Sequence, residues 1–334
     1  MDKIDIVYLW VDGADKKWLA EKNKYAKLEN DETIKLTRVA NAERYRDNGE
    51  LKYSLRSLEK YVPWVNHIYI VTGFGQIPKW LNTKHPKITI VPHEQIMPSD
   101  ALPTFNSTAI NMGLGNIPNL SEHFLVTNDD IIFNKILKPS FFFDKRGRPI
   151  THFVSNKHIY RRIGYNFDNV SVYRSKLLLC AKLIKDLYGR NVYKYSPAHG
   201  VEPFLKSSWF ECRNHPLIKP LLDKTTRNKF RKKNELQIWL FSLYNLVHKR
   251  GVFRRARPHK SGRNKILDAI YNTIYYRKTR QSTYVCPCVL GHEKSLKNCA
   301  VFCINDSSDN TPEMLQANKN YLEARFPNKS EYEK

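Results

Sequence analysis

Two apolar runs that each end in acidic residues constrain the fold of this chain more than any other feature. Residues 4–11 and residues 124–127 are rich in β-branched and aromatic side chains, which is typical of strands buried in a sheet. Each run stops at a group of polar residues: Asp12, Gly13 and Asp15 follow the first, and Asn128, Asp129 and Asp130 follow the second. We therefore expect two strands that deliver carboxylates at their carboxyl ends.

The acidic residues predict a ligand site at one edge of the sheet. Open α/β sheets bind ligands just beyond the carboxyl ends of their strands, and paired aspartates there can hold a divalent cation, Mg²⁺ or Mn²⁺, against a diphosphate. The sequence thus favours a nucleotide-sugar site. The alternative for Asp129 and Asp130 is a solvated turn or a helix cap, because Asp and Asn commonly fill those positions after a strand.

The rest of the chain alternates between strand and helix patterns. Apolar residues spaced along residues 50–62 predict a helix that ends at Pro63, and strands are expected at residues 67–72 and 88–91. Further helices are expected at residues 105–114, 177–187, 236–247 and 311–325. The predicted fold class is α/β: a doubly wound, mostly parallel, Rossmann-like sheet with a helical, basic insertion in the C-terminal half.

Positive charge is concentrated in the C-terminal half. The formal net charge is +24, and residues 213–263 contain 15 Lys and Arg against only Asp223 and Glu235. Such a stretch attracts polyanions, whether nucleic acid, an anionic membrane surface or a phosphate-bearing polysaccharide, and a solvated basic face is the plain alternative. Nucleic acid is the disfavoured partner, because carboxylates at two strand ends repel a phosphate backbone unless a cation intervenes.

The sequence also bears on location. No window of about 18 consecutive apolar residues occurs, and charges at Asp2, Lys3 and Asp5 stand where a signal peptide has its apolar core. We therefore expect a cytoplasmic protein, with peripheral attachment of its basic surface to the inner face of the cell membrane as a further hypothesis.

Four of the six cysteines raise the question of a structural zinc. Cys286, Cys288, Cys299 and Cys303, with His292 between them, offer enough ligands for a tetrahedral Zn²⁺. Their spacings are not those of the usual zinc knuckle, and Cys299 and Cys303 fit the alternation of an ordinary buried strand. Buried cysteines are the main expectation, and Zn²⁺ is the lesser alternative.

Two further positions are open to two interpretations. Asn106 and Ser107 stand near the expected start of the helix at residues 105–114, where free N–H groups suit phosphate but where a simple cap is equally expected. His199 lies in an expected loop, and from its position alone it is a surface residue or a satisfied hydrogen-bonding group.

Taken together, these motifs resemble the Stealth family of sugar-1-phosphate transferases. That family includes bacterial capsular and exopolysaccharide phosphotransferases, and the catalytic region of the lysosomal-enzyme N-acetylglucosamine-1-phosphotransferase is similar. The resemblance covers nearly the whole chain in four ordered blocks: residues 4–15, 44–130, 199–231 and 303–330. The motifs that carry it include Arg46-Asp47-Asn48-Gly49, Pro103-Thr104-Phe105-Asn106-Ser107, Asn128-Asp129-Asp130 and Cys303-Ile304-Asn305-Asp306.

The resemblance implies a particular reaction. Members transfer a hexose-1-phosphate from a UDP-sugar to a hydroxyl of a glycan or lipid-linked glycan, form a phosphodiester and release UMP. Such a reaction requires in-line positioning, neutralisation of charge on the equatorial oxygens and a base for the incoming hydroxyl. Two alternatives remain: a glycosyltransferase that attacks the anomeric carbon and releases UDP, and a polyanion-binding protein without enzymatic activity.

The resemblance also implies roles for individual residues. His199 becomes the preferred general base, with Asp306 as the rival base or its orienting partner. Asp129, Asp130 and Asp12 would hold the metal. The phosphate-binding candidates are Arg46, Arg56 and Arg231, with intradomain ion pairing as the alternative for the first two. The catalytic set is thus His199, Asp306, Arg231 and Asp130, and the remaining substrate-binding candidates are Gly13, Asp15, Asp47, Asn106, Ser107, Asn128, Lys206 and Asn305.

We expect three regions. Residues 1–150 form the nucleotide-sugar-binding half of the catalytic α/β core. Residues 151–298 form a helical basic region that carries the general base and the acceptor surface. Residues 299–334 supply a strand and a helix that complete the core.

Overall fold

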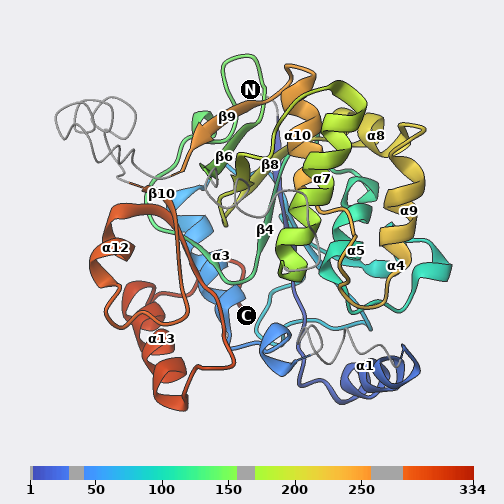
Figure 1. Cartoon of the computed structure of the whole chain (residues 1–334). Helices are drawn as coiled ribbons and strands as arrows, with labels where there is room; N and C mark the ends of the chain where they lie inside the picture. Colours follow the sequence, from blue (N-terminus) through green and yellow to red (C-terminus); the bar gives the residue numbers. More distant parts are fainter. Residues whose placement is uncertain (1–2, 30–40, 156–169, 257–280) are drawn as a thin grey trace.

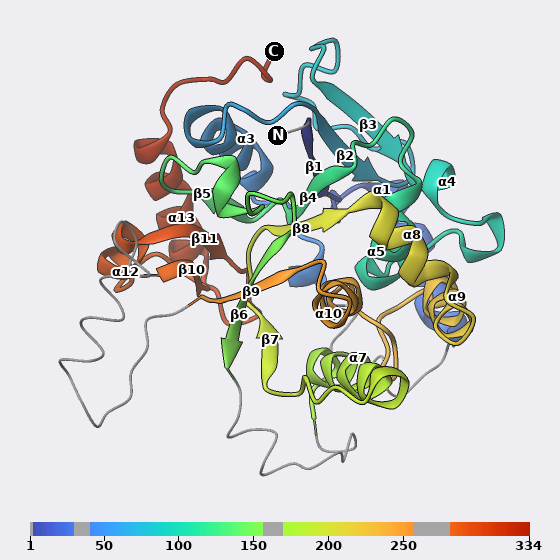
Figure 2. The ribbon, with the colours of Figure 1, turned by 90° about the horizontal axis from the view of Figure 1, so that it is seen from above.

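A five-stranded sheet forms the centre of the molecule. The computed structural model describes residues 3–29, 41–155, 170–256 and 281–334. The strand order of the main sheet is β3-β2-β1-β4-β8 (Figure 2). Figure 1 shows β4 and β8 next to each other. Strands β1 to β4 are parallel, and β8 is antiparallel to β4. The bounds are β1 (Ile4–Leu9), β2 (Ile68–Thr72), β3 (Ile88–Pro92), β4 (His123–Asn128) and β8 (Glu202–Leu205). The predicted doubly wound, mostly parallel sheet is confirmed.

The side chains of β1 explain why both faces of this sheet are covered. Val7 and Leu9 belong to one hydrophobic cluster, whereas Ile4, Ile6 and Tyr8 belong to another. Successive side chains of a strand point to opposite faces, so a run that is almost wholly apolar buries itself only between two layers.

Helices supply those two layers. The α3 helix packs on one face with Leu51, Leu55 and Leu58, which recur at the spacing of a single helical stripe. Helices α5, α7, α8, α9 and α10 contribute to the cluster on the other face (Figure 2). The helix bounds are α1 (Lys16–Glu29), α3 (Glu50–Tyr61), α4 (His93–Ile96), α5 (Ser107–Gly113), α7 (Val172–Tyr188), α8 (Lys206–Asn214), α9 (Lys219–Arg227), α10 (Trp239–Val247), α12 (Glu293–Asn298) and α13 (Pro312–Arg325).

A small sheet ties the C-terminal strand to the end of β4. Its order is β10-β11-β5, with β11 parallel to β10 and antiparallel to β5. Because β5 begins directly after Asp130, the pairing of Ile131 with Cys303 brings β11 against the acidic end of β4. The bounds are β5 (Ile131–Phe133), β10 (Gln281–Cys286) and β11 (Cys299–Ile304).

A second small sheet lies in the middle region of the chain. Its order is β7-β6-β9, and its bounds are β6 (Ile150–Ser155), β7 (Tyr195–Pro197) and β9 (Val252–Arg255). The expected helices of this region are present, but the region is not simply helical. It also provides β8 of the main sheet and β10, which pairs with β11 across the predicted boundary at residue 298. The three-part division stays a prediction.

No helix in the described part of the chain has the length and apolar character needed to cross a membrane.

Candidate functional site

The carboxyl ends of β1 and β4 lie side by side. Leu9 of β1 is in register with Asn128, the last residue of β4. Asp12 and Asp129 therefore leave the sheet from the same edge. The backbone N–H of Asp130 donates to Asp129 Oδ1 over 3.2 Å in the turn that leads into β5. The predicted meeting of two acidic strand ends is present in the fold.

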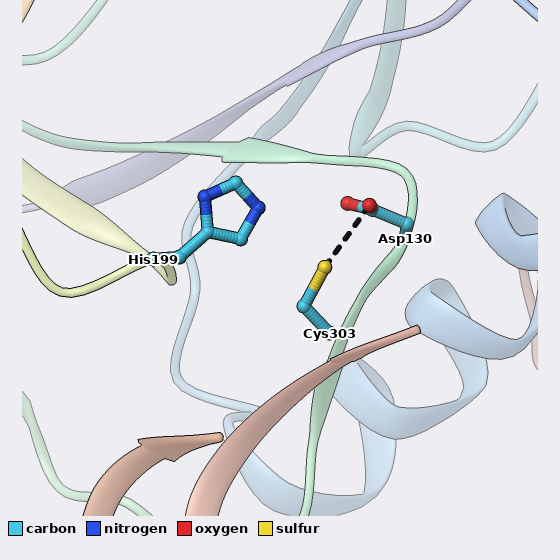
Figure 3. A group of neighbouring side chains, drawn as sticks. All are labelled: Asp130, His199 and Cys303. Carbon is cyan, nitrogen blue, oxygen red and sulfur yellow. Dashed lines mark hydrogen bonds between the residues drawn. The ribbon is translucent and has the colours of Figure 1, made fainter. Parts of the chain in front are cut away.

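Three side chains from distant parts of the sequence meet at this turn. Asp130, His199 and Cys303 each offer a potential ligand atom, and these atoms lie within 4.8 Å of one another (Figure 3). The Cys303 thiol donates to Asp130 Oδ2 over 3.0 Å. Asp130 Oδ1 is buried and has no hydrogen-bond partner among the described residues. The carboxylate is thus held by one oxygen while the other stays available.

His199 reaches this cluster from the loop between β7 and β8. Its side chain is exposed, and Figure 3 shows the imidazole directed toward the Asp130 carboxylate. The loop is fixed on both sides: the N–H of Ala198 donates to the carbonyl of His152 over 2.9 Å, and Gly200 packs so closely on Thr283 that a Cβ there would lie 2.7 Å from its Cγ2. A solvent-accessible imidazole beside a buried carboxylate suits proton transfer.

Buried and half-buried carboxylates crowd the same edge of the sheet. Burial raises the pKa of Asp129 well above its ordinary value, and the charges of Asp130, Glu50 and Asp47 add to the effect. Burial also raises the pKa of Asp130, although the nearby His199 opposes the shift. Burial raises the pKa of Glu50 to about 7, although its hydrogen bonds from Asn48 oppose the shift. So many acids close together favour either shared protons or a bound cation.

Two of these acids belong to the turn that starts α3. Gly49 has a φ of 85°, which glycine adopts without strain, and its N–H donates to Asp47 Oδ1 over 2.8 Å. The N–H and the side-chain amide of Asn48 donate to the two oxygens of Glu50, each over 2.8 Å. The turn therefore aims both carboxylates with local hydrogen bonds.

Asp306 is engaged with Arg46 rather than with His199. Arg46 Nη1 lies 3.3 Å from Asp306 Oδ2, and Asn48 Nδ2 donates to the same oxygen over 3.4 Å. Asp306 Oδ1 accepts from Asn310 Nδ2 over 3.0 Å. Asp306 is outside the group formed by Asp130, His199 and Cys303. Its carboxylate holds the Arg46 side chain instead.

Arg231 lies beside the start of α5, where it contacts Ser107. Its Nη2 donates to Ser107 Oγ over 2.7 Å, and its Nε is buried without a hydrogen-bond partner among the described residues. Burial lowers the pKa of Arg231, an effect that Tyr45 opposes. The carbonyl of Tyr45 in turn accepts from the N–H of Gly13 over 2.8 Å, and a Cβ at Gly13 would come within 2.4 Å of that oxygen. Arg231 is therefore linked to the loop that follows β1.

Asn106 is a structural residue in this fold. It caps α5 by accepting from Thr108 N over 3.0 Å, and its amide nitrogen donates to the carbonyls of Asn228 and Phe230 and to Glu235 Oε1. The side chain is fully buried and its bonds are internal. The capping interpretation of Asn106 is therefore confirmed, and Ser107 is left as the polar group of this helix start that contacts Arg231.

The remaining candidates near β1 and β11 are at the same edge. Asp12 is fixed through its backbone by two hydrogen bonds with the Gln76 side chain, and its Oδ1 accepts from Ala14 N over 2.9 Å. Asp15 Oδ1 accepts from Trp18 N over 2.8 Å and so caps α1. Asn128 and Asn305 are exposed directly after β4 and β11.

Two predicted substrate-binding residues are placed elsewhere. Arg56 Nε and Nη2 each donate to a carboxylate oxygen of Glu333 over 2.7 Å, and its Nη1 donates to the carbonyl of Phe326. This is the ion-pair alternative, and it anchors the C-terminal segment. Lys206 follows Leu205, which pairs with the first residue of β4, so it lies at the opposite end of the sheet from Asp130. We withdraw both residues as phosphate-binding candidates.

The cysteines do not form the alternative zinc site. In the described ranges, the one group of His, Cys and acidic side chains close enough to hold a metal is Asp130, His199 and Cys303. All six cysteines are buried and unbridged. The thiols of Cys299 and Cys288 point to the carbonyls of Leu296 and Met314 instead of to one another.

The basic stretch at residues 213–263 is not one uniform surface. Arg227 Nε lies 2.8 Å from Asp100 Oδ2, Arg250 pairs with Glu211, and Lys219 lies 2.5 Å from Asp223. These pairs cancel part of the charge locally. Residues 257–263 lie outside the described ranges.

Sequence reasoning missed Glu50 and Cys303 as members of the site. Glu50 was expected as the first residue of a helix, and Cys303 as a buried strand residue or, in the lesser alternative, a zinc ligand. A signal existed for each: Glu50 lies three residues after Asp47 across an Asn-Gly turn, and Cys303 lies three residues before Asp306. Neither spacing reveals that both side chains approach the end of β4.

Comparison with known proteins places the chain among a defined group. The model of Stealth protein conserved region 2 matches residues 44–151, and that of Stealth protein conserved region 1 matches residues 2–27. The chain is 32% identical over 363 residues to the exopolysaccharide phosphotransferase cps2G of Lactiplantibacillus plantarum, with 99% of this chain and 96% of the relative covered. It is 31% identical to the capsular polysaccharide phosphotransferase WcwK of Streptococcus pneumoniae, with both chains fully covered.

Among solved structures, the chain is similar to that of the galactosyltransferase LgtC in complex with donor and acceptor sugar analogues. The TM-score is 0.45 at 12% sequence identity, with 98% of each chain covered. A similarity at this level adds nothing to the assignment of the site.

Proposed function

Because the chain belongs to the Stealth family, whose matched relatives are named capsular and exopolysaccharide phosphotransferases, we propose that it transfers a hexose-1-phosphate from a UDP-sugar to a hydroxyl of a glycan acceptor. The acceptor oxygen attacks the phosphorus that carries the sugar. The bond between that phosphorus and the bridging oxygen breaks, a phosphodiester forms and UMP leaves.

One observation carries this proposal. An exposed imidazole, that of His199, lies beside a buried carboxylate whose free oxygen, Asp130 Oδ1, has no partner among the described residues. Phosphoryl transfer needs a base for the nucleophile next to a place where phosphate charge is neutralised. The imidazole supports the first requirement, and the carboxylate supplies a ligand for a cation that would meet the second.

His199 is the general base in this proposal. It takes the proton of the acceptor hydroxyl as the new P–O bond forms, and its exposure leaves room for an acceptor that arrives from solvent. Asp130 lies within 4.8 Å and stabilises the imidazolium that results. Asp306, which binds Arg46, has no part in this proton transfer.

The acidic edge fits a hard divalent cation such as Mg²⁺ or Mn²⁺. Asp129 and Asp130, with Asp12 from the neighbouring strand end, would hold it through oxygen ligands. Of these three, only Asp130 belongs to the close ligand group in the described ranges, so Asp12 and Asp129 would have to approach it when the ion binds. The unpaired Asp130 Oδ1 supports this fit, and so does the Cys303 thiol, whose hydrogen bond fills Oδ2. When bound, the cation would neutralise charge on the diphosphate.

The arginines complete the donor site in this proposal. Arg46 and Arg231 contact phosphate oxygens. Asp306 holds the first guanidinium group and Ser107 the second. Their guanidinium groups already have one partner each, so they are oriented before the donor arrives. Gly13, Asp15, Asp47, Asn128 and Asn305 line the same edge of the sheet.

The division of the chain follows the same logic. We assign donor binding to residues 1–150, the base and the acceptor surface to residues 151–298, and completion of the core to residues 299–334.

A cytoplasmic location with peripheral contact to anionic lipid is part of this proposal. Flotation with anionic liposomes at physiological salt tests the contact, and absence from the lipid fraction would count against it.

The released nucleotide is the decisive measurement. Purified protein is incubated with a panel of UDP-sugars, Mg²⁺ and a glycan acceptor, and the nucleotides are separated by chromatography. UMP supports phosphoryl transfer, whereas UDP would assign the enzyme to the glycosyltransferases. If neither appears while the protein binds RNA tightly without metal, a polyanion-binding function would replace both.

The base is tested by His199→Ala. We expect turnover to fall about 10²- to 10⁴-fold while donor affinity stays nearly unchanged, because the imidazole acts on the acceptor proton. The half-buried His215→Ala, remote in sequence from the acidic strand ends, is the control. Near-normal turnover in His199→Ala would move the base role to another residue.

A further inference from the structure

A cavity lies between the turn after α7 and the end of α10. Its empty volume is about 620 Å³, part of it open to solvent. Arg190, Asn191 and Lys194 supply its polar wall, and Leu246 of α10 belongs to its apolar wall. No acidic residue of the described chain lines it. A concave site with an apolar floor and two cations suits an anionic, partly apolar ligand such as a phosphorylated sugar.

The cations of this cavity are not used elsewhere in the described structure. Arg190 is exposed and has no hydrogen bond or ion pair with any described residue. Lys194 is exposed as well, and its Nζ lies 5.0 Å from the ring centre of Tyr195. This differs from the arginines at positions 227 and 250, which are paired with acids. Two unpaired cations on one cavity wall leave their donors free for a ligand.

The cavity wall is rigid on the side of Tyr195. The ring of Tyr195 packs edge-to-face on Phe153 at 4.8 Å and on Phe253 at 5.2 Å between ring centres. These partners belong to β6 and β9, the strands that form one small sheet with β7. An anchored aromatic residue beside two exposed cations gives the wall a fixed surface.

The strand β7 connects this cavity to the catalytic edge. Tyr195 lines the cavity and begins β7, and His199 follows only four residues later. Since an extended chain advances at most about 3.6 Å per residue, the two positions are no more than about 15 Å apart. A short oligosaccharide can therefore reach from the cavity to the base.

We propose that this cavity is an acceptor subsite that binds a phosphodiester group of the growing glycan. The inference rests on the proposed function, because a growing glycan carries negatively charged phosphodiester groups only if the enzyme transfers sugar phosphates. Arg190 and Lys194 hold the anionic link, and the sugar beyond it places its hydroxyl at His199. Binding there favours acceptors that already carry the enzyme's own linkage over neutral ones.

The test compares two acceptors in the full-length enzyme. One is a short oligosaccharide that contains a phosphodiester, and the other is the same oligosaccharide without phosphate. We expect Arg190→Glu and Lys194→Ala to raise the KM of the phosphodiester acceptor about tenfold or more each, because a charge-assisted hydrogen bond is lost. The kcat, the KM of the donor and the KM of the neutral acceptor should change less than about threefold.

Lys224→Ala is the matched control. Lys224 is an exposed lysine of α9, outside the cavity, and its removal lowers the net charge by the same amount as Lys194→Ala. It should leave the KM of both acceptors unchanged. An equal rise of KM in Lys224→Ala would replace the subsite with a general effect of charge.

The outcomes separate this inference from the proposed function. If wild-type enzyme releases UMP but Arg190→Glu has the wild-type KM for the phosphodiester acceptor, the subsite is wrong and the reaction stands. If wild-type enzyme releases UDP, the proposed reaction fails. Titration of the phosphodiester oligosaccharide into donor-free protein then still decides the cavity: equal affinity in wild type and Arg190→Glu overturns the subsite.

Discussion

Two groups of buried or half-buried charges differ in how completely their polar atoms are paired. In the first, Lys176 Nζ lies 2.5 Å from Glu235 Oε2 and donates to Thr108 Oγ1 over 2.8 Å. The other oxygen of Glu235 accepts from Asn106 and Asn228. This group joins α7 to the start of α5 and to the loop before α10.

The second group is the acidic edge around Asp130. It contains several carboxylates, its charges share one sign, and one buried oxygen has no partner among the described residues. Opposite charges that satisfy each other stabilise a fold, whereas like charges held together cost stability unless a ligand compensates. The difference indicates that the first group is structural and the second is a binding site.

The largest expected effect tests the second group. Asp130→Asn should lower turnover about 10⁴-fold or more, because several kcal/mol of charge stabilisation at the diphosphate are lost. Without metal, its melting temperature should equal or exceed that of wild type, since a buried like-charge contact is removed. Initial rates of UMP release and thermal unfolding measure the two effects. Asp186→Asn, which changes an exposed aspartate of α7, is the control. A destabilised Asp130→Asn would place Asp130 among the structural charges.

The next effect tests the first group. Lys176→Met should lower the free energy of unfolding by about 3–5 kcal/mol, because it leaves Glu235 charged and buried without its cation. Denaturant titration measures the change. The double variant Lys176→Met/Glu235→Leu should recover most of the loss. A single variant as stable as wild type would show that the ion pair is not what holds α7 to α5.

A further acid, outside both groups, extends the comparison between paired and unpaired buried charges. Glu202 of β8 has a buried oxygen without a described partner, and burial raises the pKa of Glu202 to about 8. The folded protein therefore binds more protons than the unfolded chain between about pH 4.5 and pH 8, so this residue reduces stability as the pH rises through that range.

Glu202→Gln should remove this pH dependence. We expect the variant and wild type to have similar free energies of unfolding at pH 4.5, with the variant more stable by on the order of 2 kcal/mol at pH 8.5. Denaturant titrations at the two pH values measure the difference. A difference of the same size at both pH values would mean that Glu202 does not titrate in this range.

The smallest effect concerns the hydrogen bond that Asp130 receives from the Cys303 thiol. Cys303→Ala removes the thiol donor and should lower kcat/KM about tenfold, the effect expected for one lost hydrogen bond to a charged group. Cys303→Ser keeps a donor and should stay within about threefold of wild type. Equal losses in both variants would assign Cys303 to packing alone.

Local sequence was enough to predict much of this fold. The apolar runs of β1 and β4 predicted buried parallel strands, and the stripe of Leu51, Leu55 and Leu58 predicted α3, because these patterns depend only on neighbouring residues. The same reasoning failed for residues 195–205, where β7 and β8 were not expected. Both are short, and their partners lie far away in the sequence, so nothing in the local pattern identified them.

By itself, the sequence determined that acidic residues end two neighbouring strands, because strand direction and residue order fix which groups reach an edge of the sheet. Only the tertiary structure decided which side chains join them. It brought His199 and Cys303 to Asp130 and gave Arg56 to Glu333, although the sequence offered His199 and Arg56 as candidates for the same site. The physical reason is that contacts between residues so far apart in the chain depend on the packing of whole strands and helices, which no local pattern encodes.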